Sequence, residues 1–193
     1  MVSSYLKKPL KSNERNKIDK CLLNMITKDL QPFSIVEDEG FKEFTRALNP
    51  SYDLPSRKTL SDRLLQSEYD VKLASTKEVV MNNCDTICLT VDCWTSRTMT
   101  AYIAITGHFI HRENLEFNSF LLQCSALEGS HTGLNIAQEL KRIADEWSLT
   151  NKVNFIVTDN ASNMLSAANI LGWEHFGCYV HKLNLIVQEG LKM

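Results

Sequence analysis

The chain has 193 residues, of which 44% are hydrophobic and 23% charged, and its formal net charge is -2. These values are typical of one globular domain with room for an appended helical region, and they exclude a protein that is basic throughout. No apolar run approaches the roughly 18 to 20 residues of a membrane helix, so no membrane partner is expected. The six irregularly spaced cysteines favour a reducing, intracellular compartment, and the first residues do not have the pattern of a secretory signal.

The most basic part of the chain is residues 1–20, where six cations minus two acids give a local charge of about +4. Its cations include Lys7, Lys8, Lys11 and Arg15. A solvated helix face is one interpretation of this pattern, and contact with nucleic-acid phosphates is the other. Apolar residues then recur at helical spacing up to Pro32, which predicts a first helix.

Two more helices are predicted before residue 83. A short amphipathic helix ends at Asn49, before Pro50, and Ser56 is placed to cap a long helix over about residues 57–80. Arg57 and Lys58 lie on its polar side and are candidate phosphate contacts. We therefore expect residues 1–82 to form a helical region.

The periodicity changes to that of strands after residue 83. The pattern predicts an α/β fold over residues 83–193, a mixed five-stranded sheet in the order 3-2-1-4-5 with the second strand antiparallel to its neighbours. The fourth strand is apolar enough to be buried on both faces. The expected strands are 85–93, 100–110, 116–124, 152–158 and 176–180. The expected helices are 132–147, one that follows the loop 159–162 and ends at Gly172, and 181 to about 191.

An acid interrupts the first strand at Asp92. Burial of an unpaired carboxylate costs several kcal/mol, so Asp92 is exposed at the sheet edge, hydrogen-bonded or bound to a cation. Trp94 is expected on the opposite face, in the core.

Asp159 ends the fourth strand, which the predicted order places beside the first. Two neighbouring carboxylates repel each other unless a cation lies between them, and this pattern indicates Mg²⁺ or Mn²⁺ and phosphoryl-transfer chemistry. An acid before a helix is also a common helix cap, which is the alternative for Asp159.

Three ordered segments carry a resemblance to a known family: Leu89-Thr-Val-Asp92-Cys-Trp-Thr-Ser96, Val157-Thr-Asp159-Asn-Ala-Ser-Asn-Met164 and Cys178-Tyr-Val-His181-Lys-Leu-Asn-Leu185. With residues 28–36 and 54–60, the chain resembles the RNase H-like core of hAT-superfamily transposases and of the zinc-finger BED-domain proteins derived from them, over about residues 15–191. The resemblance implies that Asp92 and Asp159 are the first two acids of an Asp, Asp, Glu triad. It also implies that Cys178 and His181 are the Cys-x-x-His motif, and that the helices before the core bind DNA and oligomerise.

The chain departs from this family pattern in several places. Four features of the family are not recognised in this sequence: the BED finger, the glutamate that completes the triad, the large helical insertion and the dimerisation segment. We therefore expect a fragment or degenerate copy without complete catalytic machinery, holding Mg²⁺ or Mn²⁺ weakly at Asp92 and Asp159. Cys178 and His181 supply only two of the four ligands that structural zinc requires, which favours a packing or hydrogen-bonding role.

Three functions remain open at this point. The first is a transposase-derived nuclear protein that binds DNA, without a small-molecule substrate and with homo-oligomerisation possible. The second is an active transposase or nuclease, if a downstream glutamate is supplied. The third is a protein-interaction module that retains the fold.

Overall fold

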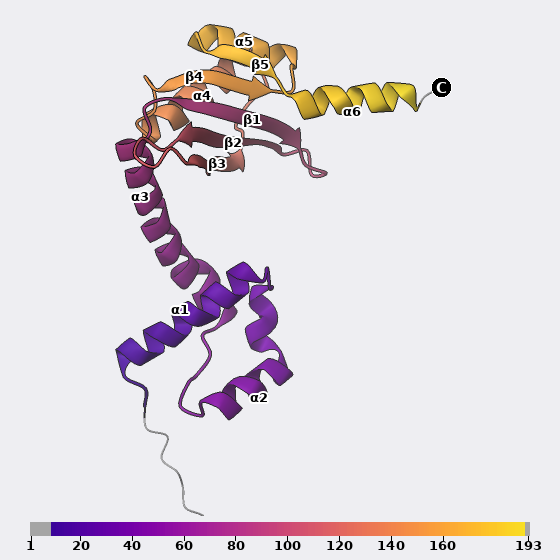
Figure 1. The fold of residues 1–193 in the computed structure, drawn as a ribbon. Helices are drawn as coiled ribbons and strands as arrows, with labels where there is room; N and C mark the ends of the chain where they lie inside the picture. Colours follow the sequence, from indigo (N-terminus) through magenta and orange to yellow (C-terminus); the bar gives the residue numbers. More distant parts are fainter. Residues whose placement is uncertain (1–8, 192–193) are drawn as a thin grey trace, which may run out of the picture. The chain divides into compact units, whose positions relative to one another are not determined.

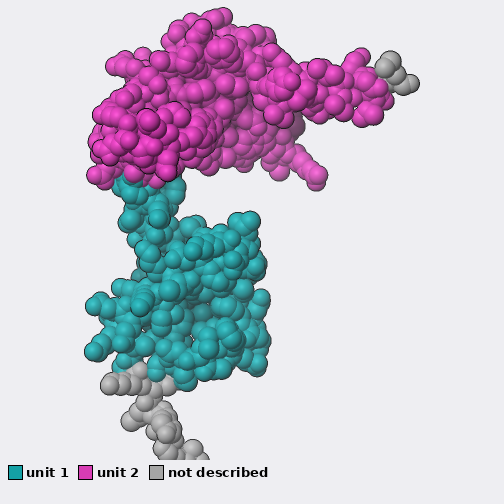
Figure 2. Space-filling model, viewed as in Figure 1, with its two compact units in different colours: residues 1–75 teal, residues 76–193 magenta. Residues whose placement is uncertain are grey.

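The computed structural model describes residues 9–191 and divides the chain into two compact units, residues 1–75 and 76–193 (Figure 2). The division falls within the long helix α3 (Leu65–Asn83), whereas the sequence placed the end of the helical region after residue 82. Within residues 9–191, none of the helices combines the length and hydropathy needed to cross a bilayer. Each unit is built around its own set of buried side chains.

The first unit is helical, as expected. A small core of Leu22, Ile26, Val36 and Leu60 holds it together. The Ser56 hydroxyl accepts a hydrogen bond from the Thr59 backbone N–H at 3.1 Å, which confirms the predicted cap. Besides the start of α3, its elements are α1 (Ser12–Lys28), the 3₁₀ turn η1 (Phe33–Glu37), α2 (Glu39–Leu48) and the π-helical segment η2 (Thr59–Leu64).

A buried polar pair joins α1 to the loop after α2. The Tyr52 hydroxyl donates to the Asp19 carboxylate at 2.7 Å, and both residues are at most 5% exposed. Burial, followed by the hydrogen bond to Asp19, raises the pKa of Tyr52 above its ordinary value. The contribution of this pair to stability is therefore present below about pH 10 and is lost as the pH rises further.

Tyr52→Phe is expected to lower the free energy of unfolding by about 1–3 kcal/mol, because it leaves a buried carboxylate without its donor. Urea unfolding at neutral pH, followed by circular dichroism, measures the change. Tyr69→Phe, at a residue with 56% exposure, is the control and should behave as the wild type. Equal stability of the two variants would show that the hydrogen bond from Tyr52 to Asp19 makes no net contribution to the free energy of unfolding.

The second unit contains the five-stranded sheet, and its order β3-β2-β1-β4-β5 confirms the prediction (Figure 1). β2 is antiparallel to β1 and β3, whereas β4 is parallel to β1 and β5. The strands are β1 (Ile87–Thr95), β2 (Ala101–Ile110), β3 (Phe117–Ala126), β4 (Val153–Thr158) and β5 (Glu174–Gly177). The helices are α4 (Gly133–Glu146), α5 (Ser162–Leu171) and α6 (Tyr179–Gly190).

The core of this unit lies on one face of the sheet. Side chains alternate along a strand, and Leu89, Ile105 and Ile156 on this face are at most 2% exposed. α4 contributes Ile136 and Leu140, both at most 1% exposed. The buried face is therefore the one that the amphipathic helix α4 covers, together with α5.

The opposite face, which we call the open face, carries large apolar side chains that remain accessible: Trp94, Ile110, Phe117, Leu121, Phe155 and Phe176. Two expectations were therefore wrong. β4 is not buried on both faces, since Phe155 is 38% exposed. Trp94 is not in the core but shares the face of Asp92, because residues two apart along a strand point to the same side.

Candidate functional site

Asp92 lies on the open face of β1, a central strand between β2 and β4. Its side chain is exposed, and within residues 9–191 it makes no hydrogen bond or ion pair. The charge therefore avoids the cost of burial because it lies on an exposed sheet face. Of the three alternatives that the sequence left open, exposure at the sheet edge does not hold, since β1 is a central strand. An accessible carboxylate without a partner is free to bind a ligand.

Asp159 begins the turn between β4 and α5. One of its carboxylate oxygens, Oδ1, accepts a hydrogen bond from the Ala161 N–H at 3.0 Å, and Asn160 takes a left-handed conformation with φ of 67°. The N-cap of α5 is Ala161, so Asp159 shapes the turn and does not cap the helix. The turn therefore holds the carboxylate through a hydrogen bond to one of its two oxygens.

The sheet register brings the two acids level with each other. β1 and β4 are parallel neighbours, and Thr90 pairs with Val157. Two residues further along the chain are Asp92, still in β1, and Asp159, just past the end of β4, and both line the same cavity of about 550 Å³. The predicted convergence of the two strand-end acids is therefore present in the structure.

The pKa of Cys93 also reflects the closeness of the two acids, because both carboxylates influence this one thiol. Burial raises the pKa of the Cys93 thiol to about 11, and the negative charges of Asp92 and Asp159 both add to the rise. Two carboxylates with a shared field and a shared cavity fit the oxygen-ligand preference of Mg²⁺ or Mn²⁺. Within residues 9–191, no three His, Cys, Asp or Glu side chains gather closely enough to hold a metal ion.

The third motif lines the same cavity from the start of α6. Cys178 and His181 are both partly buried there, and Asn184 follows on the next turn. The Cys178 N–H donates to the Thr158 carbonyl at 2.6 Å, which ties the motif to the end of β4. All four residues that the family resemblance singled out therefore surround one cavity.

Sequence reasoning missed the contacts that hold the Asp159 turn in place. The Thr158 hydroxyl, which is 1% exposed, lies 2.8 Å from Nε2 of His175. Gly177 leaves room for the Asn160 side chain, since a Cβ at Gly177 would lie 2.3 Å from Asn160 Oδ1. Among the missed cavity residues, Thr90 and Thr106 share the open face with Asp92 and could have been found from strand alternation.

The candidate phosphate-binding cations lie in the first unit, whereas the cavity is in the second. Lys11, Arg57 and Lys58 are exposed and join no ion pair among the described residues. Arg15 is exposed too, and it donates to the Asp53 carbonyl at 3.4 Å. Lys7 and Lys8 lie outside the described residues.

Comparison with known proteins points to one group. Residues 90–176 match the family model of the ZBED1 RNase-like domain. Zinc finger BED domain-containing protein 6 of Homo sapiens is 29% identical over 187 residues, which cover 89% of this chain and 19% of that protein. Its counterpart in Mus musculus is 30% identical over 189 residues, covering 90% of this chain and 19% of that protein.

A plant protein gives a second kind of match. The putative AC transposase of Zea mays is 29% identical over 200 residues, covering 95% of this chain and 24% of that protein. These matches confirm the resemblance stated from the three motifs. The chain spans about a fifth of the length of the curated relatives it matches.

Proposed function

Because residues 90–176 match the ZBED1 RNase-like domain family, we propose that this chain is part of a transposase-derived, nuclear protein that associates with DNA. The observation that carries the proposal is the convergence of Asp92, Asp159, Cys178 and His181 on one cavity. These residues come from three separate segments of the sequence. Self-association belongs to the same proposal, since α6 exposes Val180, Leu183 and Val187.

Asp92 and Asp159 would hold the divalent cation in this proposal. When bound, such a cation supplies Lewis-acid polarisation of a phosphate oxygen. His181 lines the same cavity, and its imidazole can donate a hydrogen bond to a phosphate there. The Thr158, Asn160 and Gly177 contacts keep Asp159 in position on the cavity wall.

The same proposal holds that the chain does not cleave DNA alone. Two carboxylates leave a bound cation largely to water, and a two-metal reaction needs both metals held against the attacking and leaving oxygens. Supercoiled plasmid incubated with the chain and Mn²⁺ should therefore remain intact, as judged by gel electrophoresis.

An active transposase or nuclease is the second candidate, and the shared cavity of the two acids favours it. Cleavage of plasmid by the wild type, lost in both Asp92→Asn and Asp159→Asn, would establish this candidate. The same result would reject the proposal that the chain is inactive. Cleavage that persists in the two variants would instead identify a contaminating nuclease.

DNA association is expected to be electrostatic and to involve Arg57 and Lys58. Each phosphate contact that is lost should weaken duplex binding for all sequences and reduce the slope of log K against log salt by about 1. The double variant Arg57→Ala/Lys58→Ala should therefore reduce that slope by about 2. Fluorescence anisotropy with a labelled duplex, titrated at several NaCl concentrations, measures it.

The control for this experiment is Lys28→Ala/Lys72→Ala, which removes the same charge from exposed lysines elsewhere in the described chain. A positional role predicts that only the Arg57 and Lys58 variant changes the slope. An equal reduction of the slope in both variants would show that the effect depends on net charge and not on the position of Arg57 and Lys58. Wild-type binding that is insensitive to salt would reject DNA association through phosphates.

A further inference from the structure

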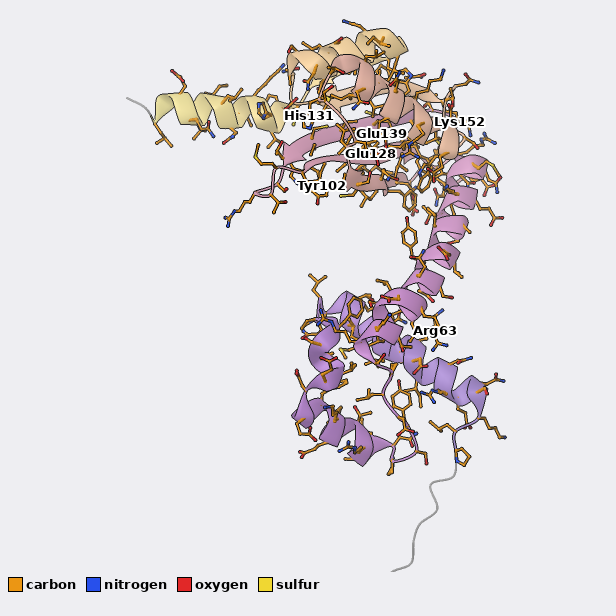
Figure 3. The ribbon with its side chains drawn as sticks, turned by 180° about the vertical axis from the view of Figure 1, so that it is seen from behind. Arg63, Tyr102, Glu128, His131, Glu139 and Lys152 are labelled. Carbon is orange, nitrogen blue, oxygen red and sulfur yellow. The ribbon has the colours of Figure 1, made fainter. Side chains whose placement is uncertain are left out.

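The hairpin that joins β1 to β2 carries two stacked aromatic rings beside Asp92. Trp94 and Tyr102 are directly paired across the hairpin, with ring centroids 5.5 Å apart and planes inclined by only 12°. Trp94 is 40% exposed, and Figure 3 labels Tyr102 on β2. Aromatic side chains usually bury their rings in a core or an interface, so a stacked pair that leaves Trp94 exposed and Tyr102 only partly buried needs an explanation.

The hairpin turn holds the pair in a defined conformation. The Ser96 N–H donates to the Thr100 carbonyl at 2.8 Å, and the Met99 N–H donates to the Ser96 carbonyl at 3.0 Å. The Ser96 hydroxyl also accepts from the Thr100 N–H at 3.1 Å and lies 2.9 Å from the Thr98 hydroxyl. A ligand that stacks on Trp94 therefore meets a prearranged surface and orders little of the protein.

The hairpin turn beside the pair carries a cation, which favours an anionic ligand. This cation is Arg97, and no acid lies between it and Asp92 in the sequence, whereas Arg112 lies beyond the far end of β2 and pairs with Asp85. Arg97 is exposed and joins no ion pair among residues 9–191. A cation and several hydroxyls next to two flat rings combine phosphate recognition with stacking, the two interactions that bind single-stranded nucleic acid.

We propose that Trp94 and Tyr102 form a stacking platform for an unpaired base of a DNA strand whose phosphates approach Arg97 and the Asp92 cavity. This inference rests on the proposed DNA association and assigns it a second site, in the unit that contains the sheet. Trp94 lies two residues beyond Asp92 on the same face, so a base on the indole places its strand beside the two acids. The ligand class is a DNA strand with at least one unpaired nucleotide.

A probe with a base analogue tests the platform directly. A single-stranded DNA of about twelve nucleotides with one 2-aminopurine is titrated with the full chain, and both affinity and 2-aminopurine fluorescence are recorded. The wild type should quench the fluorescence by stacking. Trp94→Ala should weaken binding by about 5- to 150-fold, the range expected for one base stacked on an aromatic side chain, and should abolish the quenching.

Conservative variants separate stacking from general apolar contact. Trp94→Phe keeps a ring and should retain most of the affinity, whereas Trp94→Leu keeps an apolar side chain and should behave as Trp94→Ala. Phe117→Leu, at a 68% exposed residue of the same open face, is the matched control and should leave binding unchanged. Thermal unfolding of each variant verifies that the fold is retained.

The remaining outcomes distinguish the platform from the function it rests on. If the chain binds duplex DNA in a salt-dependent way but Trp94→Leu binds the single strand as the wild type does, the platform is rejected and DNA association stands. If the wild type binds neither duplex nor single strand, DNA association fails and the platform fails with it. Loss of self-association in Trp94→Ala, with unchanged DNA binding, would assign the pair to a protein contact and overturn the proposal.

Discussion

Asp92→Asn and Asp159→Asn should each reduce Mn²⁺ affinity by more than the roughly 10- to 100-fold that loss of an outer-shell contact typically costs. The physical reason is that the cavity brings these two carboxylates level on neighbouring strands. Either substitution removes half of the negative charge that attracts the cation. Isothermal titration calorimetry and Mn²⁺ electron paramagnetic resonance report the loss without reference to DNA or cleavage.

The asparagine variants are suitable because they preserve the structure around the charge. In Asp159→Asn, the amide oxygen would remain an acceptor for the Ala161 N–H, and Asp92 has no partner among the described residues to lose. Removing one of two like charges should leave the melting temperature unchanged or raise it. A binding loss without a stability loss would identify these acids as ligands and not as structural groups.

Asp38→Asn serves as the charge-matched control, since Asp38 is exposed and belongs to the first unit. It should bind Mn²⁺ as the wild type does. If the wild type takes up no Mn²⁺, or if the Asp92 and Asp159 variants bind it undiminished, the acids do not form a cation site.

The second large effect is expected at Gly133, where α4 packs against α5. A Cβ at Gly133 would lie 2.5 Å from Cβ and Oγ of Ser166 and 3.0 Å from the Asn163 carbonyl oxygen. A side-chain Cβ and a backbone carbonyl cannot rotate away, so Gly133→Ala must push the two helices apart. Overpacking of this kind costs about 1–3 kcal/mol, which exceeds the roughly 0.5–1 kcal/mol that alanine gains over glycine inside a helix.

Urea unfolding of Gly133→Ala should therefore show a lower midpoint with an unchanged slope. Gly40→Ala is the matched control, because Gly40 lies in α2 with nothing within 4 Å of the added Cβ. It should be as stable as the wild type or more so. The double variant Gly133→Ala/Ser166→Gly should recover part of the loss, and failure to recover any would mean that the Ser166 contact is not the cause.

Gly133→Ala also tests the link between packing and the site. α5 begins three residues after Asp159, so displacement of this helix moves the turn that holds the carboxylate. Mn²⁺ affinity should fall together with stability in this variant. In Asp92→Asn, by contrast, only the affinity should fall.

The sheet order could be predicted from the sequence because local patterns and chain connectivity agree. Ile87, Leu89 and Val91 alternate with less apolar residues, and the stripe from Ile136 to Trp147 marks a helix that covers a sheet face. A strand, helix, strand passage with a right-handed crossover then places β4 next to β1. The meeting of Asp92 and Asp159 follows from that adjacency alone.

The environment of individual side chains could not be predicted in the same way. Apolar residues such as Phe155 and Trp94 indicate burial, but hydropathy does not say which face of a sheet the helices cover. The Thr158–His175 contact and the close approach of Gly177 to Asn160 join segments that are distant in sequence. No local pattern marks either contact, although both position the Asp159 turn.

α6 runs away from the sheet in Figure 1, and none of its twelve residues is buried. With no buried residue, α6 gains little stability from tertiary packing, and isolated helices of this length are marginal in water. We therefore expect its backbone amides to exchange hydrogen faster than those of α4. His181 lies in its first turn, on the wall of the Asp92 cavity. We therefore expect that a surface covering Val180, Leu183 and Val187 of α6 would also order His181, so that the order of the cavity depends on whether this helix is formed.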